Sequence, residues 1–470
     1  PTDALPIYMN FTMIRNWVGQ IGDKEFYEAC DRHGIMVWQD FWLANPVDGP
    51  NPYYTEMFNA NACDYLKRIR NHPSIGIYVG RNEGNPPAGI DDYLRGLVFR
   101  EHPGLYYISN SAMGVVSGGG PYRALSPKSY FQSYGHDKFH SERGMPNVMN
   151  YESMLLTFGT DKIEPVNTSE TPNPVYGLHD YTLGGGKGSS AQAASSFNDM
   201  IEKAFGRPRD AKQFAEWAQW INYDGYRAIF EGRSEHRRGM LLWMSHSAWP
   251  SMVWQTYDYY FDPNAAYFGC KKASEPLHIQ WNPLRDDIEV VNYHAFDRTG
   301  LTATASLFNQ DGTLQWTRET KLDIKEDQTV ACFPLEQPET LSDTYFIKLS
   351  LTDSDGKQLS DNFYWRGKED GNYKSLLQLP KVSVCKNVTV KKTGKEWLIR
   401  AVLKNEARTP ALMLRLKVAG EKSGRMLLPV FYSDNYFSLL PGEVKEVDIR
   451  LYDADTYGEK PVLEVLGFNL

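Results

Sequence analysis

The stretch SIGIYVGRNEGNP, residues 74–86, carries the pattern from which the fold is predicted. Residues 75–79 are uncharged and rich in Ile, Tyr and Val, which is typical of a short buried strand. Arg81, Asn82 and Glu83 follow this strand, and Gly and Pro residues then end it. An Asn-Glu pair at the end of a buried strand is where an α/β barrel places its chemistry, although an ordinary solvated strand end has the same composition.

Apolar strands alternate with helices over the first part of the chain. The strands are apolar throughout, as in parallel sheets that are covered on both faces. Long irregular stretches at 114–133 and 147–188 are typical of functional loops. The predicted strands are 11–17, 35–38, 75–79, 105–109 and 240–244, and the predicted helices are 23–34, 61–70, 197–205 and 210–231.

The pattern changes after about residue 276, where apolar and polar residues alternate. This alternation is clear at residues 301–307, 345–351 and 412–418 and is typical of antiparallel β-sandwiches. The predicted fold class is therefore α/β plus all-β. It consists of a (β/α)8 TIM-type barrel truncated at its start (1–275), an immunoglobulin-like β-sandwich (276–368) and a second immunoglobulin-like β-sandwich (369–470).

A second carboxylate has a setting like that of Glu83. The segment FHSERG, residues 139–144, is short and places Glu142 near a glycine. Two carboxylates at the mouth of one barrel can divide the roles of acid and nucleophile. In a retaining glycosidase the two carboxyl groups lie roughly 5 Å apart.

Several blocks of the chain, in order, resemble glycoside hydrolase family 2, in the branch of exo-β-glucosaminidases, plant-type endo-β-mannosidases and β-mannosidases. The resemblance covers nearly the whole chain and implies that Glu83 is the general acid/base and Glu142 the nucleophile. The blocks are MNFTMIRNW (9–17), GIMVWQDFW (34–42), RNHPSIGIYVGRNEGNPP (70–87), FHSERG (139–144), MLLWMSHSAWPS (240–251), AAYFGCKKASEPLHIQ (265–280) and DNFYWRGKEDGNYKSL (361–376).

The same resemblance implies a set of substrate-binding residues. Asn82 is expected to hydrogen-bond the sugar 2-hydroxyl, with capping of the strand end as the alternative. Arg15 and Trp17 are expected to line the −1 subsite, and Arg15 could instead pair with a catalytic glutamate. Trp243 resembles the family's −1 platform, and Trp249 is expected to close over the sugar; a place in the core is the alternative for both.

Asp40 is the residue on which the substrate prediction depends. Its carboxylate could pair with the ammonium of a glucosamine or accept hydroxyl hydrogens from a mannose. Exo-β-glucosaminidases carry Ser-Asp where this chain has Asn82-Glu83, a departure that favours the mannosidase side. The FHSERG block argues for the glucosaminidase side.

The predicted function is a retaining β-glycoside hydrolase that cleaves β-mannosidic linkages by double displacement, without metal or cofactor. One alternative is an exo-β-D-glucosaminidase acting on chitosan oligomers, and another is a non-catalytic carbohydrate-binding protein. The expected partner is an oligosaccharide or glycan. Upstream sugar-binding-like and immunoglobulin-like domains of a full-length protein are also expected, because the first barrel strand is missing from the pattern.

Composition excludes several other classes of partner. The 470 residues include 58 acidic and 50 basic side chains, so no basic face points to nucleic acid. No apolar run approaches the roughly 20 residues of a membrane span. The five cysteines suggest neither a disulfide framework nor a metal motif, and the periplasm is not excluded. His136 and His140 are not taken as zinc ligands, and the glycine-rich segment 184–188 lacks the Ser or Thr of a phosphate loop.

Overall fold

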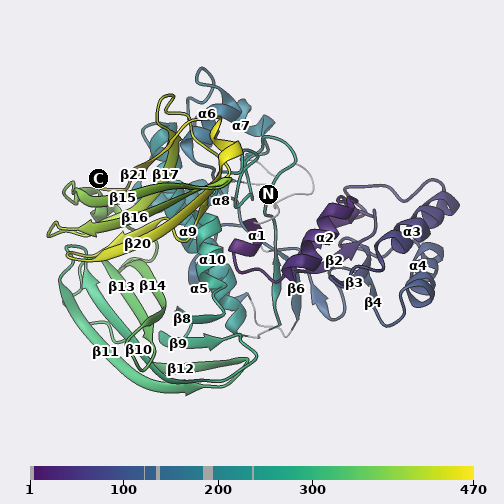
Figure 1. Cartoon of the computed structure of the whole chain (residues 1–470), viewed down its shortest axis with the longest axis horizontal. Helices are drawn as coiled ribbons and strands as arrows, with labels where there is room; N and C mark the ends of the chain where they lie inside the picture. Colours follow the sequence, from purple (N-terminus) through teal and green to yellow (C-terminus); the bar gives the residue numbers. More distant parts are fainter. Residues whose placement is uncertain (1–4, 121, 134–137, 184–193, 236–237) are drawn as a thin grey trace.

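The N-terminal part of the molecule is a lobe built on a four-stranded parallel sheet (Figure 1). The protein is described by a computed structural model that covers residues 5–120, 122–133, 138–183, 194–235 and 238–470. The strands of the lobe lie side by side in sequence order, and their carboxyl ends therefore share one edge. They are β1 (Met13–Asn16), β2 (Met36–Asp40), β3 (Ile75–Arg81) and β4 (Tyr106–Asn110).

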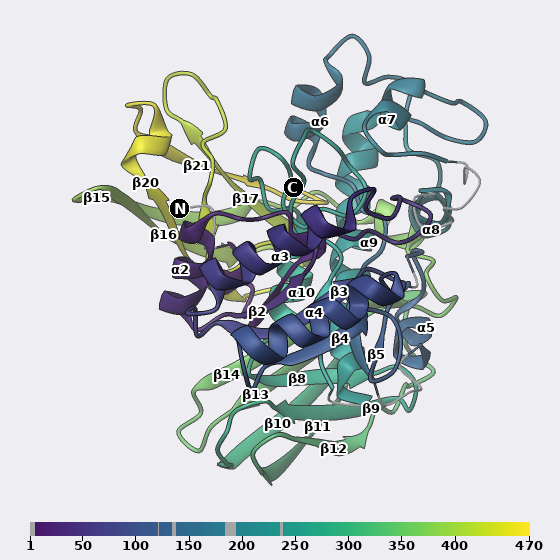
Figure 2. The same ribbon diagram turned by 90° about the vertical axis from the view of Figure 1, so that its right-hand side faces the viewer.

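Three helices pack on this sheet: α2 (Lys24–His33), α3 (Thr55–Ile69) and α4 (Ala88–Glu101) (Figure 2). Gly34 ends α2. Its backbone is in the left-handed conformation, with φ 66°, which glycine adopts without strain. Buried Tyr27, Leu66 and Leu94 belong to one apolar cluster between helices and sheet. This packing fixes where each strand ends.

A second parallel sheet contains β5 (Val116–Ser117), β6 (Phe139–Arg143) and β7 (Met240–Leu242). Helices lie between its strands and after β7, and one of them, α9 (Ala211–Glu231), is buried along nearly its whole length. The remaining helices are α1 (Leu5–Tyr8), α5 (Pro127–Gln132), α6 (Tyr151–Phe158), α7 (Pro174–Leu178), α8 (Ser195–Phe205), α9 (Ala211–Glu231) and α10 (Ala265–Ala273).

β1 and β7 are the facing edges of the two parallel sheets. A cavity of about 450 Å³ lies beside them and is lined by residues of both strands, among them Met13, Leu241 and Leu242. Within the described residues, no further strand pairs with the free edge of β1 or of β7. The cavity also reaches Arg15, so it adjoins the ends of the strands.

Residues 277–367 form two antiparallel sheets that share one apolar core. β10 alternates buried and half-exposed residues at 301–307, as the sequence pattern predicts. The strands are β8 (Leu277–Asn282), β9 (Asp287–Asn292), β10 (Arg298–Asn309), β11 (Leu314–Ile324), β12 (Gln328–Pro334), β13 (Thr344–Thr352) and β14 (Gln358–Gly367).

The C-terminal part is a second pair of antiparallel sheets. Its core includes residues of facing sheets, such as Ile399, Leu416 and Ile449. The strands are β15 (Val384–Thr393), β16 (Glu396–Asn405), β17 (Ala411–Gly420), β18 (Phe431–Tyr432), β19 (Phe437–Leu439), β20 (Val444–Tyr452) and β21 (Pro461–Leu466).

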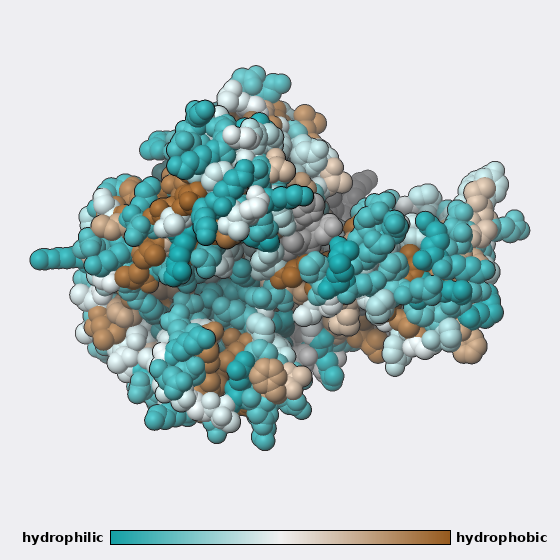
Figure 3. All heavy atoms as spheres, viewed as in Figure 1, coloured by the Kyte–Doolittle hydropathy of each residue, from teal (hydrophilic) through white to brown (hydrophobic). Residues whose placement is uncertain are grey.

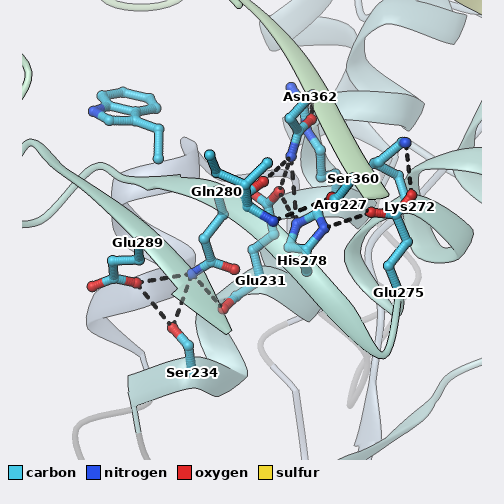
Figure 4. Close-up of polar contacts among 12 residues, drawn as sticks. Arg227, Glu231, Ser234, Lys272, Glu275, His278, Gln280, Glu289, Ser360 and Asn362 are labelled. Atoms are coloured by element: carbon cyan, nitrogen blue, oxygen red, sulfur yellow. Dashed lines mark hydrogen bonds and ion pairs between the residues drawn. The ribbon is translucent and has the colours of Figure 1, made fainter. Parts of the chain in front are cut away.

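A buried polar network joins the α/β part to the first pair of antiparallel sheets (Figure 4). His278 of β8 lies with Nε2 3.0 Å from the Glu231 carboxylate at the end of α9 and with Nδ1 3.1 Å from the Glu275 carboxylate. Asn362 of β14 donates to the same Glu231 oxygen at 2.8 Å. Burying these polar and charged side chains without hydrogen-bond partners would cost free energy. Because their partners lie on both sides of the junction, the network holds the α/β part and the first pair of antiparallel sheets together.

The structure confirms the mixed α/β part followed by β-sheets. Both stretches predicted to be irregular contain regular elements: β5 and α5 lie within 114–133, and α6 and α7 lie within 147–188. The predicted helix 61–70 also begins earlier, at Thr55, because the apolar stripe extends to buried Phe58. His136 and the segment 184–188 lie outside the described residues.

The face seen in Figure 3 is mostly hydrophilic, with hydrophobic residues in separate groups. No helix among the described residues has the length and hydropathy needed to cross a membrane. Within the same ranges, no cluster of three or more His, Cys, Asp or Glu side chains is arranged to hold a metal ion.

Candidate active site

Arg15, at the carboxyl end of β1, is the centre of a buried polar cluster. Its Nη2 donates to Oδ2 of Asp40 at 2.8 Å and to Oδ1 of Asn82 at 2.7 Å. Its Nη1 donates to Oε1 of Glu142 at 3.0 Å. Residues from the ends of β1, β2, β3 and β6 thus meet at one guanidinium, because parallel strands bring their carboxyl ends together.

Glu142 lies on β6 and is held by two donors. Arg15 binds one carboxylate oxygen, and the Tyr122 hydroxyl donates to the other. The side chain of Glu142 is only 5% exposed. Burial, followed by the Glu142 charge, raises the pKa of Tyr122 far above its usual range, so this hydroxyl keeps its proton and remains a donor.

Glu83 follows β3, and its backbone φ of 46° is one that residues other than glycine rarely adopt. Its backbone N–H donates to Oγ of Ser111 at 2.9 Å. Burial raises the pKa of the Glu83 carboxyl, and the Glu142 charge raises it further, whereas Arg15 lowers it. The net direction is upward, which favours a protonated carboxyl beside an anionic one.

Asn82 and Asp40 are both buried and are occupied by protein donors. Oδ1 of Asn82 accepts from Arg15 and from Oγ of Ser111, the latter at 3.2 Å. Oδ1 of Asp40 accepts from the Trp38 indole at 2.7 Å, while Oδ2 accepts from Arg15 and from the Val18 N–H. Asp40 is 0% exposed, so in this structure its contacts are with protein groups.

Aromatic rings form a chain from β1 to the loop that carries Tyr122. The rings of Trp17 and Trp243 meet edge to face with centroids 5.0 Å apart, and Trp243 lies 6.1 Å from Trp254. Trp254 in turn lies 6.0 Å from Tyr122. Trp249 is placed differently: its ring stacks on His179 and is 43% exposed.

Comparison with known proteins gives both sequence and fold relatives. Residues 362–470 match the family model described as the exo-β-D-glucosaminidase Ig-fold domain. A mannosylglycoprotein endo-β-mannosidase of Lilium longiflorum is 26% identical over 98% of this chain and 60% of its own length. An exo-β-D-glucosaminidase of Streptomyces avermitilis is 28% identical over 96% of this chain and 55% of its own length.

Two solved structures share the fold of this chain. The exo-chitosanase of Amycolatopsis orientalis has a TM-score of 0.86 at 24% identity, covering 100% of this chain and 60% of that one. The β-D-mannosidase of Dictyoglomus thermophilum has a TM-score of 0.76 at 20% identity, covering 100% and 58%. In sequence, the chain is similar to exo-β-D-glucosaminidases and to an endo-β-mannosidase. It spans 55–60% of the length of the two curated relatives described above.

The structure brings Asp40, Asn82 and Glu142 into direct contact with Arg15, and the charges of Arg15 and Glu142 act on the Glu83 carboxyl. Tyr122, which binds Glu142 directly, was not among the predicted site residues. One signal was available, because Tyr122 lies in the irregular stretch 114–133 that was predicted to be functional.

Trp254 was also missed, and its sequence offered no comparable signal. It lies beyond the MLLWMSHSAWPS block, in a loop whose residues show no periodicity. Only the packing of its ring between Trp243 and Tyr122 links it to the site.

Proposed function

We propose that this chain carries the catalytic site of a retaining β-glycoside hydrolase that cleaves β-mannosidic linkages. The observation that carries the proposal is the unequal setting of two neighbouring carboxyls. Glu142 is bound by a guanidinium and a hydroxyl, whereas burial and the Glu142 charge raise the pKa of Glu83. Such a pair can divide the roles of nucleophile and general acid.

In the first step a Glu142 oxygen attacks the anomeric carbon, the bond to the leaving oxygen breaks, and Glu83 gives that oxygen its proton. The resulting ester removes the Glu142 charge, and with it one cause of the raised pKa of Glu83. In the second step ionised Glu83 takes a proton from water, whose oxygen attacks the anomeric carbon and releases Glu142. In this proposal Glu83 carries out both proton transfers, and neither step uses a metal or cofactor.

The substrate-binding residues keep the roles that the family resemblance implies. Asn82 would meet the sugar 2-hydroxyl, and Arg15 would orient Glu142 at the −1 subsite. Trp17 and Trp243 would form the wall of that subsite, which their edge-to-face contact supports. Trp249, which is 43% exposed, would contribute from the outer loop.

The finer fold is part of the same proposal. The seven parallel strands would belong to a (β/α)8 barrel spanning 1–275, with immunoglobulin-like sandwiches at 276–368 and 369–470. The apolar cavity beside β1 and β7 supports this arrangement, because one further parallel strand would close the ring there. The longer relatives support an upstream region that supplies it.

An exo-β-D-glucosaminidase acting on chitosan oligomers is the second candidate. It is favoured by the match of residues 362–470 to the exo-β-D-glucosaminidase Ig-fold domain. The occupation of both Asp40 oxygens by protein donors weighs against it, because Asp40 was the carboxylate that could pair with the substrate ammonium.

The test compares hydrolysis of a chromogenic β-mannoside and a chromogenic β-glucosaminide by the complete protein, with Glu142→Ala as the blank. Preferred turnover of the mannoside is expected, with the β-anomer of mannose as the first product seen by NMR. Preferred turnover of the glucosaminide would support the second candidate. Binding of both sugars without turnover would instead support a non-catalytic carbohydrate-binding protein.

A further inference from the structure

Arg81, the last residue of β3, holds one loop at three points. Its Nε donates to the Ala44 carbonyl at 2.7 Å, and its Nη1 donates to Oδ1 of Asn51 at 2.7 Å. Its Nη2 donates to the Gly49 carbonyl at 3.3 Å. Arg81 is only 3% exposed, although the loop formed by residues 44–51 is largely at the surface. All three guanidinium nitrogens therefore serve this loop.

The loop 44–51 lies against the residues that follow Arg81. A Cβ atom placed on Gly84 would be 2.9 Å from Cδ of Pro46, so the loop packs closely against the chain beside Glu83. The Asn45 side chain of this loop lowers the pKa of the Glu83 carboxyl, so the loop and the carboxyl interact. Arg81 thus connects to Glu83 through the loop as well as through the adjacent backbone.

The loop has an internal structure that depends on its anchors. Oδ1 of Asn45 accepts from the N–H groups of Val47 and Asp48, at 3.0 and 2.7 Å, and Nδ2 of Asn45 donates to Asp48 at 2.6 Å. A turn of this kind, exposed on one side, has little apolar burial of its own to stabilise it. The three hydrogen bonds from Arg81 anchor this turn to the end of β3.

We propose that Arg81 is a positioning residue that holds the loop 44–51 as a wall beside Glu83. The inference rests on the proposed function, in which Glu83 protonates the leaving group. A planar guanidinium suits this role because its fixed fork of donors can bind two carbonyls and an amide at once. A lysine ammonium is a compact donor on a flexible stem and cannot reproduce that geometry.

A loosened loop admits water to Glu83. Burial is the largest cause of the raised pKa of Glu83 and outweighs the opposite effect of Asn45, so hydration of this half-buried carboxyl lowers its pKa. The charged groups that face Glu83 are Glu142 on β6, Arg15 on β1, Asp48 on the loop, and the ionisable Tyr122 hydroxyl. Of these, Asp48 belongs to the loop that Arg81 holds.

The first experiment measures hydrogen exchange in Arg81→Lys, using the complete protein. We expect exchange of the Val47, Asp48 and Gly49 amides to accelerate about tenfold or more, because the exchange rate reports local opening. Asn51→Ala, which removes one of the three acceptors, should give a smaller acceleration. Arg70→Lys is the matched control, since Arg70 binds Glu101 at 2.7 Å on the helices of the same lobe. Exchange in Arg81→Lys equal to wild type would overturn the proposal.

The second experiment separates positioning of Glu83 from mere structural support. In Arg81→Lys we expect kcat/KM for the β-glycoside to fall about 10- to 100-fold, as for a misplaced catalytic group. The alkaline limb of the pH profile should move to lower pH. Faster exchange with an unchanged alkaline limb and kcat/KM would overturn the positioning role.

Failure of the proposed function can be recognised separately. If the wild-type protein hydrolyses no β-glycoside, that function fails, but NMR titration of the Glu83 carboxyl still tests Arg81. A lower Glu83 pKa in Arg81→Lys than in wild type, together with faster loop exchange, supports the positioning role. An unchanged Glu83 pKa overturns it.

Discussion

Nη1 of Arg15 lies 3.0 Å from Oε1 of Glu142, and each of these side chains is only 5% exposed. A buried carboxylate is stable only when its charge is paired and hydrogen-bonded. Arg15 supplies that pairing, and it does so while binding Asp40 and Asn82 with its other donors. The orientation of Glu142 is therefore coupled to three strand ends.

Replacement of Glu142 by Gln should lower the pKa of Glu83. Burial raises this pKa first and the Glu142 charge second, so removing the charge removes one of the two leading causes. The Glu83 titration curve, followed by NMR of ¹³C-labelled glutamate, should shift to lower pH. Glu101→Gln, on α4, serves as the control that leaves the curve in place. A shift to higher pH in Glu142→Gln would contradict the assigned electrostatics.

Replacement of Tyr122 by Phe should reduce kcat for a β-glycoside by about 10- to 100-fold, because it removes a donor to the reacting carboxylate. Fold stability should change little, since the ring is kept. Tyr176→Phe removes a buried hydroxyl that donates to the Ile163 carbonyl at 2.9 Å, and it controls for general loss of a hydroxyl. Equal kcat values for the two variants would argue against a role for Tyr122.

Replacement of Asp40 by Asn tests how Asp40 acts. Because Asp40 is bonded to Arg15, Trp38 and Val18, we expect kcat/KM for a β-mannoside and for a β-glucosaminide to fall by similar factors. Steady-state rates on the two substrates provide the measurement. A loss confined to the glucosaminide would mean that Asp40 binds the substrate ammonium instead.

Replacement of His278 by Gln should destabilise the junction between α9 and the first pair of antiparallel sheets. Burial lowers the pKa of His278, but hydrogen bonds to Glu231 and Glu275 outweigh it, and the net pKa is raised. Removing one partner of a buried charge network costs about 3–5 kcal/mol. Urea unfolding should therefore show a lower free energy of unfolding for His278→Gln than for wild type.

The pH dependence of this loss has a definite sign. Because the pKa of His278 is higher in the folded than in the unfolded protein, its protonation stabilises the fold. This stabilisation is complete below the pKa of an unfolded histidine, about 6.5, and is lost as the pH rises through the folded-state pKa. The difference between wild type and His278→Gln should thus be largest near pH 6 and shrink at alkaline pH. His33→Gln, at an exposed position of α2, should show no such trend. A difference that grows with pH would contradict an imidazolium at this junction.

Local patterns were sufficient to predict most of the elements that carry the site. The apolar run before Arg81 predicted β3, and the structure places that strand at Ile75–Arg81. The alternation at 301–307 likewise predicted β10. These signals are local because strand burial acts on consecutive side chains. Residues 147–188 were less predictable, since short helices such as α7 owe their stability to packing.

The sequence by itself determined that Glu83 follows a segment with a strand pattern, and it placed Glu142 in a short segment of similar setting, which the structure shows to be a strand. Only the tertiary structure decided which groups surround them. Arg15 is separated by 25, 67 and 127 residues from Asp40, Asn82 and Glu142, yet it binds all three. Such contacts arise from the parallel register of the strands, and no local pattern contains them. The raised pKa of Glu83 has the same origin, since burial and neighbouring charge exist only in the folded chain.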